Sequence, residues 1–168
     1  MFNFKKAAAG SAVIAILLTG CLGGTTTDSV SDYNNKVMAG LNSINEAMGA
    51  LFDSVAEEDA DVETLEDTLN TQTEEIKGAI AEIRGLGVPA GDGVKEFSDE
   101  TEKYAVNIED FLNLMKQHVD AIKAKDESAV EKVIGKLKAK AKDISKIYGN
   151  IGVKQKEMAK KNNFELRQ

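Results

Sequence analysis

Apolar side chains recur at intervals of three and four residues along four separate stretches of this chain. That spacing puts them on one face of an α-helix, whereas a half-buried strand requires alternation at every second residue. The four sets are Val30, Tyr33, Val37, Leu41, Ile44, Met48, Leu51 and Val55; Val62, Leu65, Leu69, Ile76, Ile80, Ile83 and Leu86; Val94, Phe97, Tyr104, Ile108, Phe111, Met115, Val119 and Ile122; and Val130, Val133, Leu137, Ile144, Tyr148 and Ile151. The pattern predicts an all-α fold, an up-down-up-down antiparallel four-helix bundle over residues 30–153.

Short polar or glycine-rich breaks separate the four stretches. Residues 57–61, "EEDAD", end the first predicted helix and offer Asp59 or Asp61 as the N-cap of the second. Residues 85–93, "GLGVPAGDG", predict a loop before the third helix, with Asp92 as its N-cap.

The last predicted helix has a clear start and a weak end. Asp126 is placed to cap its first turn, and Gly149 and Gly152 weaken it near its end. From Lys154 onward we expect a frayed or disordered tail, residues 154–168.

The N-terminal 20 residues differ from the rest of the chain. Lys5 and Lys6 precede an apolar run at residues 7–18. A helix that spans a bilayer needs roughly 20 apolar residues, so this shorter run predicts the core of a secretory signal peptide. The run ends at Leu18-Thr19-Gly20-Cys21, which contains the one cysteine of the chain.

This tetrapeptide resembles the lipobox of bacterial lipoproteins at all four positions. The resemblance implies that the signal peptide, residues 1–20, is cleaved before Cys21. It also implies a diacylglycerol thioether on the sulfur of Cys21 and usually a fatty acid such as palmitate on its amino group. Each buried CH₂ contributes about 0.8 kcal/mol, so two or more chains hold a protein stably at a membrane.

The same resemblance implies an extracytoplasmic protein, anchored in the cell membrane or the outer membrane. Leu22 follows the cysteine where lipoprotein sorting uses Asp for retention in the inner membrane, which favours the outer membrane. Residues 21–29 are rich in Gly, Thr and Ser and predict a flexible tether. Its reach of at most about 30 Å keeps the body close to the bilayer.

Charge is distributed unevenly along the chain. The formal net charge is −7, which argues against binding to nucleic acid and against electrostatic docking on anionic lipid. Residues 53–75 hold ten acidic side chains and no basic one, whereas residues 132–161 hold ten lysines. These runs are typical of solvated helix faces, and they also suggest that the basic last helix lies against the acidic hairpin.

Residues able to bind metals or cofactors are few. His118 is the one histidine, and Met115 stands where a di-iron Glu-x-x-His motif requires glutamate. Residues 59–63 begin like a calcium loop, but Thr64 replaces its glycine and Asn70 its final glutamate. We therefore expect no resident metal or cofactor, although weak cation binding at residues 59–63 stays open.

Signatures of catalysis are equally weak. Residues 85–90 match G-x-G-x-x-A, but a dinucleotide site needs a strand before that motif, and a helix is predicted here. We see no G-x-S-x-G motif or Ser-His-Asp arrangement, so we do not expect an enzyme.

Two polar residues interrupt the apolar faces. Gln72 lies on the second face between Leu69 and Ile76, and Thr101 interrupts the third. They predict either a polar pair that fixes helix register or half-exposed edge positions. The alternative is a small polar cavity that binds a ligand.

Taken together, these features predict a lipid-anchored helical bundle that acts as a binding, interaction or structural module at the cell envelope. The expected partners are the membrane, through lipid on Cys21, and an envelope protein. Candidate protein-binding surfaces are residues 57–61 and the loop at residues 85–93. The alternative is a carrier of a small ligand or metal that uses the bundle interior near Gln72 and Thr101.

Overall fold

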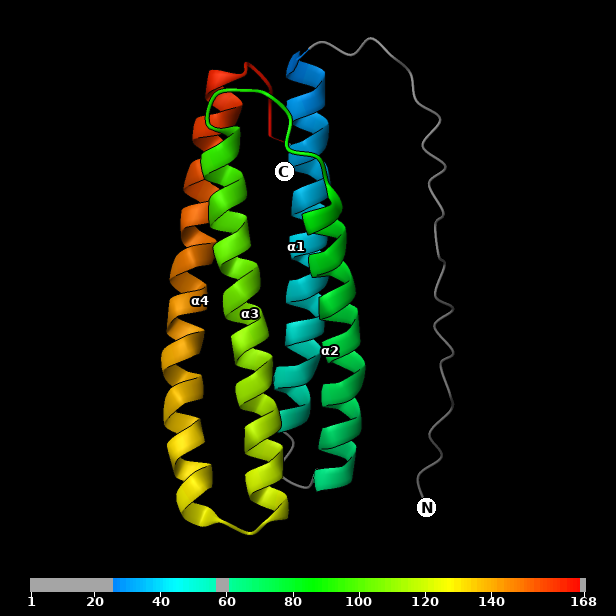
Figure 1. The fold of residues 1–168 in the computed structure, drawn as a ribbon, viewed down its shortest axis with the longest axis vertical. Coiled ribbons are helices and arrows are strands. Elements are labelled where there is room, and N and C mark those ends of the chain that lie inside the picture. The colour runs from blue at the N-terminus through cyan, green and yellow to red at the C-terminus, as the bar shows by residue number, and fades with distance from the viewer. Residues whose placement is uncertain (1–25, 57–60, 167–168) are drawn as a thin grey trace.

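Four α-helices follow one another in the part of the chain that the structure describes, residues 26–56 and 61–166 of a computed structural model. They are α1 (Thr26–Ala56), α2 (Val62–Gly85), α3 (Val94–Lys123) and α4 (Glu127–Lys161). Each helix runs antiparallel to the one before it (Figure 1), and these described residues contain no strand. The predicted all-α, up-down-up-down four-helix bundle is confirmed.

The helices pack as two close hairpins. Close backbone contacts join α1 to α2 and α3 to α4, with fewer between α2 and α3 and very few between α1 and α4. Figure 1 shows the α1–α2 pair and the α3–α4 pair side by side. The α1–α2 approach depends on a glycine, because a Cβ atom at Gly40 would lie 2.6 Å from Cγ1 of Ile83.

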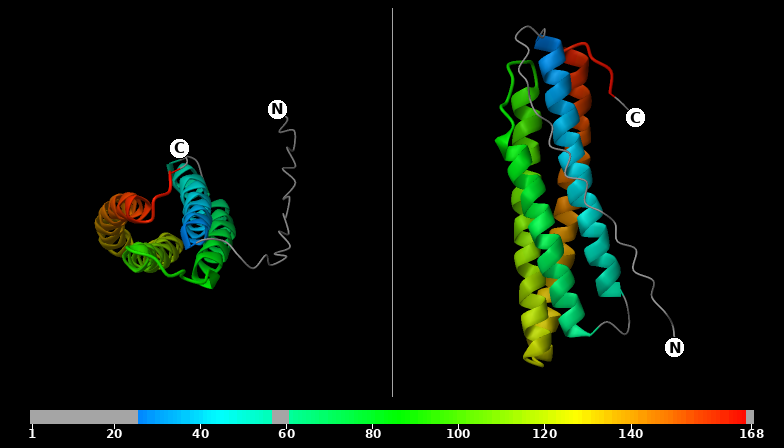
Figure 2. Two further views of the ribbon diagram at one scale, coloured as in Figure 1. Left: turned by 90° about the horizontal axis from the view of Figure 1, so that it is seen from above. Right: turned by 90° about the vertical axis from the view of Figure 1, so that its right-hand side faces the viewer.

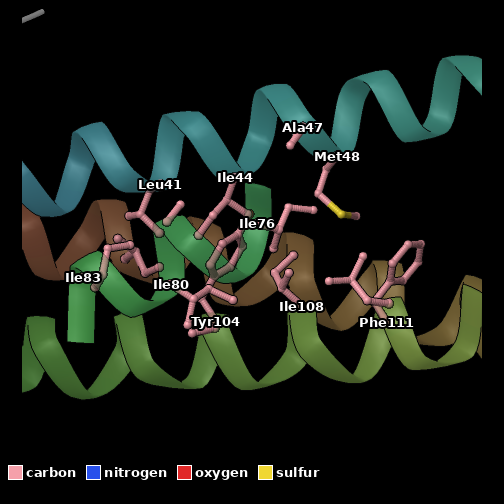
Figure 3. Close-up of a cluster of buried hydrophobic side chains, with 14 of the residues drawn as sticks. Leu41, Ile44, Ala47, Met48, Ile76, Ile80, Ile83, Tyr104, Ile108 and Phe111 are labelled. Atoms are coloured by element: carbon pink, nitrogen blue, oxygen red, sulfur yellow. The ribbon is translucent and has the colours of Figure 1, made fainter. Parts of the chain in front are cut away.

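The core contains the side chains that the periodicity predicts. From α1, α2 and α3, the fully buried set includes Leu41, Ile44, Ile76, Ile80, Phe97, Tyr104, Ile108 and Phe111. Figure 3 shows how these rows meet between the three helices. Burial of each large apolar side chain contributes about 1.5–3 kcal/mol, so this core is the main source of stability.

The fourth apolar row is less covered than the other three. Val133 and Ile151 are buried, but Leu137, Ile144 and Tyr148 between them are only partly buried. The reason is the wide separation of α4 from α1 along this stretch, since α4 packs closely on α3 alone.

Two of the predicted helix caps are confirmed and one is wrong. Asp61 accepts a hydrogen bond from the Thr64 backbone N–H at 2.8 Å, and Asp126 accepts one from the Ala129 N–H at 3.0 Å. Asp92 does not cap α3; the N-cap is Gly93, at φ 79°. The chain needs a left-handed residue there to turn into α3, and glycine adopts that conformation without a Cβ penalty.

The predicted frayed tail at residues 154–168 is wrong as far as Lys161. α4 continues through Gly149 and Gly152 to Lys161, and Met158 and Ala159 near its end are buried. Between the lysines of this stretch, Met158 continues the apolar row of α4 beyond Ile151. Contact with the core stabilises the last two turns more than the glycines weaken them.

The predicted tether at residues 21–29 is also shorter than expected. α1 begins at Thr26, and Val30 in its second turn is fully buried. Residues 21–25 lie outside the described part of the chain.

Ion pairs connect α3 to its neighbours. Arg84 of α2 forms a forked contact with Glu102 and Glu109 of α3, with shortest N–O distances of 2.7 Å to each. Lys140 of α4 pairs with Asp110 of α3 at 3.0 Å. Within the described residues, these ion pairs join α3 to α2 and to α4. The suggested pairing of the basic α4 with the acidic hairpin is not among them.

Candidate functional site

The predicted lipidation site, Cys21, and the rest of the lipobox lie outside the described residues. The nearest described residue is Thr26, the first of α1. None of the four described helices contains a stretch that is long and apolar enough to cross a bilayer.

Gln72 and Thr101 lie in different surroundings. The Thr101 hydroxyl is buried and donates to the Phe97 carbonyl of its own helix at 2.9 Å. The buried Oε1 of Gln72 has no hydrogen-bond partner among the described residues, and this side chain lines a shallow outer groove between α1 and α2. The groove that Gln72 lines does not include Thr101, and a ligand cavity shared by the two stays a prediction.

The polar contacts inside the bundle are made by residues that the sequence did not single out. Asn34 of α1 is buried, and its Oδ1 accepts from Nε2 of Gln155 of α4 at 3.0 Å. Glu100 of α3 is buried beside Asn150 of α4, whose Nδ2 donates to the carboxylate at 3.0 Å. Such paired polar groups fix the axial register of α4 against α1 and α3.

Glu100 is also the most strongly held carboxylate of this network. Lys103 donates to its Oε2 at 2.9 Å, and this hydrogen bond lowers the pKa of Glu100 below 4.5, with a further lowering by Asn150. The carboxylate is consequently charged and accepts a hydrogen bond at each oxygen, which suits a structural role rather than proton transfer.

His118 lies on the buried side of α3 near the C-terminal end of that helix. Its side chain is 9 % exposed, and Nδ1 has no hydrogen-bond partner among the described residues. Burial lowers the pKa of His118 below 6.5, so the ring is neutral at neutral pH. The described residues contain no group of three His, Cys, Asp or Glu side chains arranged to hold a metal ion.

The two sequence motifs at the ends of the bundle take structural roles where they are described. Asp61, the third residue of the calcium-like run, is the N-cap of α2, and residues 57–60 lie outside the described residues. Gly85, the first glycine of the G-x-G-x-x-A match, is the last residue of α2. A helix precedes this motif, so it has no dinucleotide-binding geometry.

The feature most suited to binding is an apolar groove between α1 and α4, with α3 as its floor. Its volume is about 210 Å³. It is lined by Asn45, Met48 and Phe52 of α1, Tyr104 and Phe111 of α3, and Ala141, Ile144, Ser145 and Tyr148 of α4. It coincides with the stretch of α4 whose apolar side chains are only partly buried.

Four aromatic rings shape this groove. Phe52 packs on Phe111 with ring centroids 5.6 Å apart, and Tyr104 packs on Tyr148 at the same distance. Phe52 is 47 % exposed, which leaves a large apolar ring facing solvent at the rim. An apolar cavity of about 150 Å³ suffices to hold benzene, so a groove of this size takes a single ring or a short acyl segment.

One hydrogen bond joins the α3 floor of the groove to its α1 side. The Tyr104 hydroxyl donates to Oδ1 of Asn45 at 2.6 Å, and this bond spans from α3 to α1. Burial raises the pKa of Tyr104, so the phenol stays protonated and keeps donating. With its hydroxyl engaged, Tyr104 contributes its ring, not a polar group, to the groove.

The larger hollows on the outer surface have a different character. A groove of about 740 Å³ between α2 and α3 is lined largely by polar side chains, among them Glu74, Lys77 and Glu109. Glu74 and Lys77 pair with each other at 3.4 Å, and Glu109 is held by Arg84. These three charges are therefore already paired, and the groove is polar where the α1–α4 groove is apolar.

No protein-family profile, curated protein or solved structure matches this chain significantly.

Proposed function

We propose that the protein is a lipid-anchored, extracytoplasmic helical bundle that acts as a binding or interaction module at the bacterial cell envelope. The observation that carries this proposal is the order of features in the chain. An apolar run, the Leu18-Thr19-Gly20-Cys21 box and the first helix follow one another with only residues 22–25 between box and helix. A chain with this order presents its bundle directly beside the membrane that holds the lipid.

The size and polarity of the bundle support a role in binding. Its helices offer four faces, of which the α1–α4 face is incompletely closed and carries the exposed Phe52. An apolar groove with an exposed aromatic ring at its rim is typical of a contact site. The described residues contain no group of His, Cys, Asp or Glu side chains arranged to hold a metal ion.

The anchor is tested by metabolic labelling with an alkyne analogue of palmitate in a bacterial host, followed by separation of membrane and soluble fractions. We expect label and membrane association for the natural chain and neither for Cys21→Ser. The matched control is Cys21→Ser with Thr25→Cys, which restores a thiol four residues outside the box and should stay unlabelled. Label on this control, or none on the natural chain, would contradict the proposal.

A second function is favoured by the apolar groove itself: carriage of a small apolar molecule. The lining of four aromatic rings, Met48 and Ile144 matches a planar or short-chain hydrocarbon ligand. In this alternative, the carrier site is the groove between α1 and α4 and not the interior near Gln72 and Thr101 that the sequence suggested.

Carriage is tested with the fluorescent probe N-phenyl-1-naphthylamine, which brightens in apolar sites. The protein used is the chain from residue 21 onward with Cys21→Ser. Ala141→Leu fills the groove, whereas Ala139→Leu adds the same volume at an exposed position two residues away on α4. We expect the probe to bind the parent and the Ala139 variant equally and to bind the Ala141 variant at least about tenfold more weakly.

Equal binding of the probe by all three proteins would contradict a carrier role for this groove. Native mass spectrometry of the same protein purified from cells then distinguishes the two functions. A retained small molecule supports carriage, and its absence favours the interaction module.

A further inference from the structure

The two ends of the bundle differ in what they expose. One end holds the start of α1, the loop between α2 and α3, and the end of α4 (Figures 1 and 2). The opposite end holds the end of α1, the start of α2, and the turn between α3 and α4. The chain that leads back to Cys21 therefore joins the body at the end that carries the α2–α3 loop.

This loop is uncharged. Between Arg84 and Asp92 the sequence is Gly-Leu-Gly-Val-Pro-Ala-Gly, and Val88 in the middle is 54 % exposed. The charge of Arg84 beside it is already bound by Glu102 and Glu109. The loop thus presents an apolar side chain and small residues to the outside, with no free charge in its span.

The loop is also held firmly at its α3 end. Nδ2 of Asn162, directly after α4, donates to the Asp92 carbonyl at 2.8 Å. A Cβ atom at Gly91 would lie 2.8 Å from Val94, 2.9 Å from Asn162 and 2.9 Å from Val30, so the loop backbone lies tightly on the start of α1. A surface held in this way needs no ordering before it makes contact.

The length of the connecting chain sets how far this surface can be from the lipid. Cys21 and Thr26 are five peptide links apart, which span at most about 18 Å at roughly 3.5 Å per link. The far end of α1 lies about 46 Å further on, at 1.5 Å per residue for 31 residues. Under the proposed anchorage, the loop end is the end that meets the bilayer.

Charge favours the same orientation. In the described residues, the far end carries Asp61, Glu63, Glu66 and Asp67 at the start of α2, and Lys123 and Lys125 at the α3–α4 turn, so acidic groups outnumber basic ones there. The loop end carries a mixture of both signs, with Lys160 and Lys161 among its basic residues. An anionic bilayer repels the far end and leaves the loop end free to approach.

We propose that the α2–α3 loop, residues 85–91, is a membrane-contacting surface that rests in the headgroup region of a phospholipid bilayer when the chain is anchored through Cys21. Val88 provides the apolar contact, and the short tether keeps it at high effective concentration beside the lipid. The bundle then stands with its acidic end away from the membrane. This inference rests on the proposed lipid anchor.

The experiment uses the full lipidated chain in vesicles of phosphatidylethanolamine and phosphatidylglycerol. Because lipid occupies Cys21, an introduced cysteine is the only free thiol, and it is labelled with the fluorophore NBD. Val88→Cys reports on the loop. Ala124→Cys, at the exposed far turn, and Val153→Cys, on the side of α4, are the matched controls.

We expect lipids that carry a spin label near the headgroup to quench NBD at Val88 about twofold, and to leave the Ala124 and Val153 positions almost unchanged. Equal quenching at all three positions, or none at Val88, would overturn the loop contact. Intact mass measured on the same samples separates the two proposals. A chain without lipid overturns the anchor and the contact together, whereas a lipidated chain with an unquenched Val88 overturns the contact alone.

Discussion

Substitution of Gly40 by alanine tests the close approach of α1 and α2. Gly40 is buried, and its Cβ atom would lie 2.6 Å from Cγ1 and 2.8 Å from Cδ1 of Ile83. Cγ1 is bonded directly to Cβ of Ile83, so relief requires a change of its first side-chain torsion or a separation of the two helices. Either response disturbs the buried row that Ile83 shares with Ile76 and Ile80.

The matched control lies in the same helix. Gly49 is exposed, and a Cβ atom there meets nothing within 4 Å. In both substitutions alanine raises the helix propensity by about 1 kcal/mol. At Gly40, overpacking opposes this gain with about 1–3 kcal/mol.

We therefore expect Gly49→Ala to stabilise the protein by about 1 kcal/mol and Gly40→Ala to leave it unchanged or destabilise it by up to about 2 kcal/mol. The difference between the two variants, about 1–3 kcal/mol, isolates the clash because the propensity gain is common to both. The measurement is urea unfolding followed by circular dichroism at 222 nm.

A second background makes the test sharper. Ile83→Ala removes both atoms that the new methyl group would meet, so Gly40→Ala should become stabilising in that background. The reasoning is refuted if Gly40→Ala stabilises the natural chain as much as Gly49→Ala does, or if the effect at Gly40 is the same with and without Ile83.

Three further substitutions test other contacts by the same unfolding assay. Asp126→Ala should lower the free energy of unfolding by about 1 kcal/mol, because α4 loses the acceptor for the Ala129 N–H. Asp126→Asn keeps an acceptor and should retain most of that stability. For His118, burial lowers the pKa of the folded state below 6.5; the unfolded chain then binds more protons, and stability falls as the pH drops through 6.5. His118→Leu should remove this pH dependence and raise the free energy of unfolding by about 1–3 kcal/mol. A loss of stability that is the same at every pH would contradict this expectation. For Glu100, Lys103 lowers the pKa in the folded state below 4.5, so its contribution is present above pH 4.5 and is lost as the pH falls through the folded pKa. Glu100→Gln should cost about 1–3 kcal/mol at pH 7 and flatten the acid limb of the stability curve.

The helices were predictable because each carries a continuous apolar row. Val62 and Val94, the first apolar residues of the second and third predicted rows, are also the first residues of α2 and α3. The caps at Asp61 and Asp126 were predictable because a short side chain with an acceptor precedes the row. Gly93 was missed because a left-handed cap depends on the path of the incoming loop, which no local pattern specifies.

The end of α4 was missed for a different reason. Gly149 and Gly152 suggested that the helix weakens before residue 154, yet one face of the stretch that follows carries the buried Met158 and Ala159. A helix needs only one apolar face, so two glycines in its length do not end it where that face continues.

The apolar groove had one signal in the sequence. From Leu137 the fourth row steps seven positions to Ile144, with only the small Ala141 at the intermediate position of that face. Whether such a gap is closed by a neighbouring helix depends on the distance between α1 and α4, which the periodicity of one helix cannot give. The polar pairs at Asn34 and Glu100 were missed for the same reason, since their partners lie on another helix.

The pattern of helix neighbours has a consequence for how the chain acquires its shape. Most close backbone contacts join helices that are consecutive along the chain, and the first and last helices share few. Proteins dominated by such local pairing fold within microseconds to milliseconds, because little loop entropy must be lost before contacts form. Each helix can therefore dock on the helix before it in the sequence, and α4 completes the bundle by packing on α3.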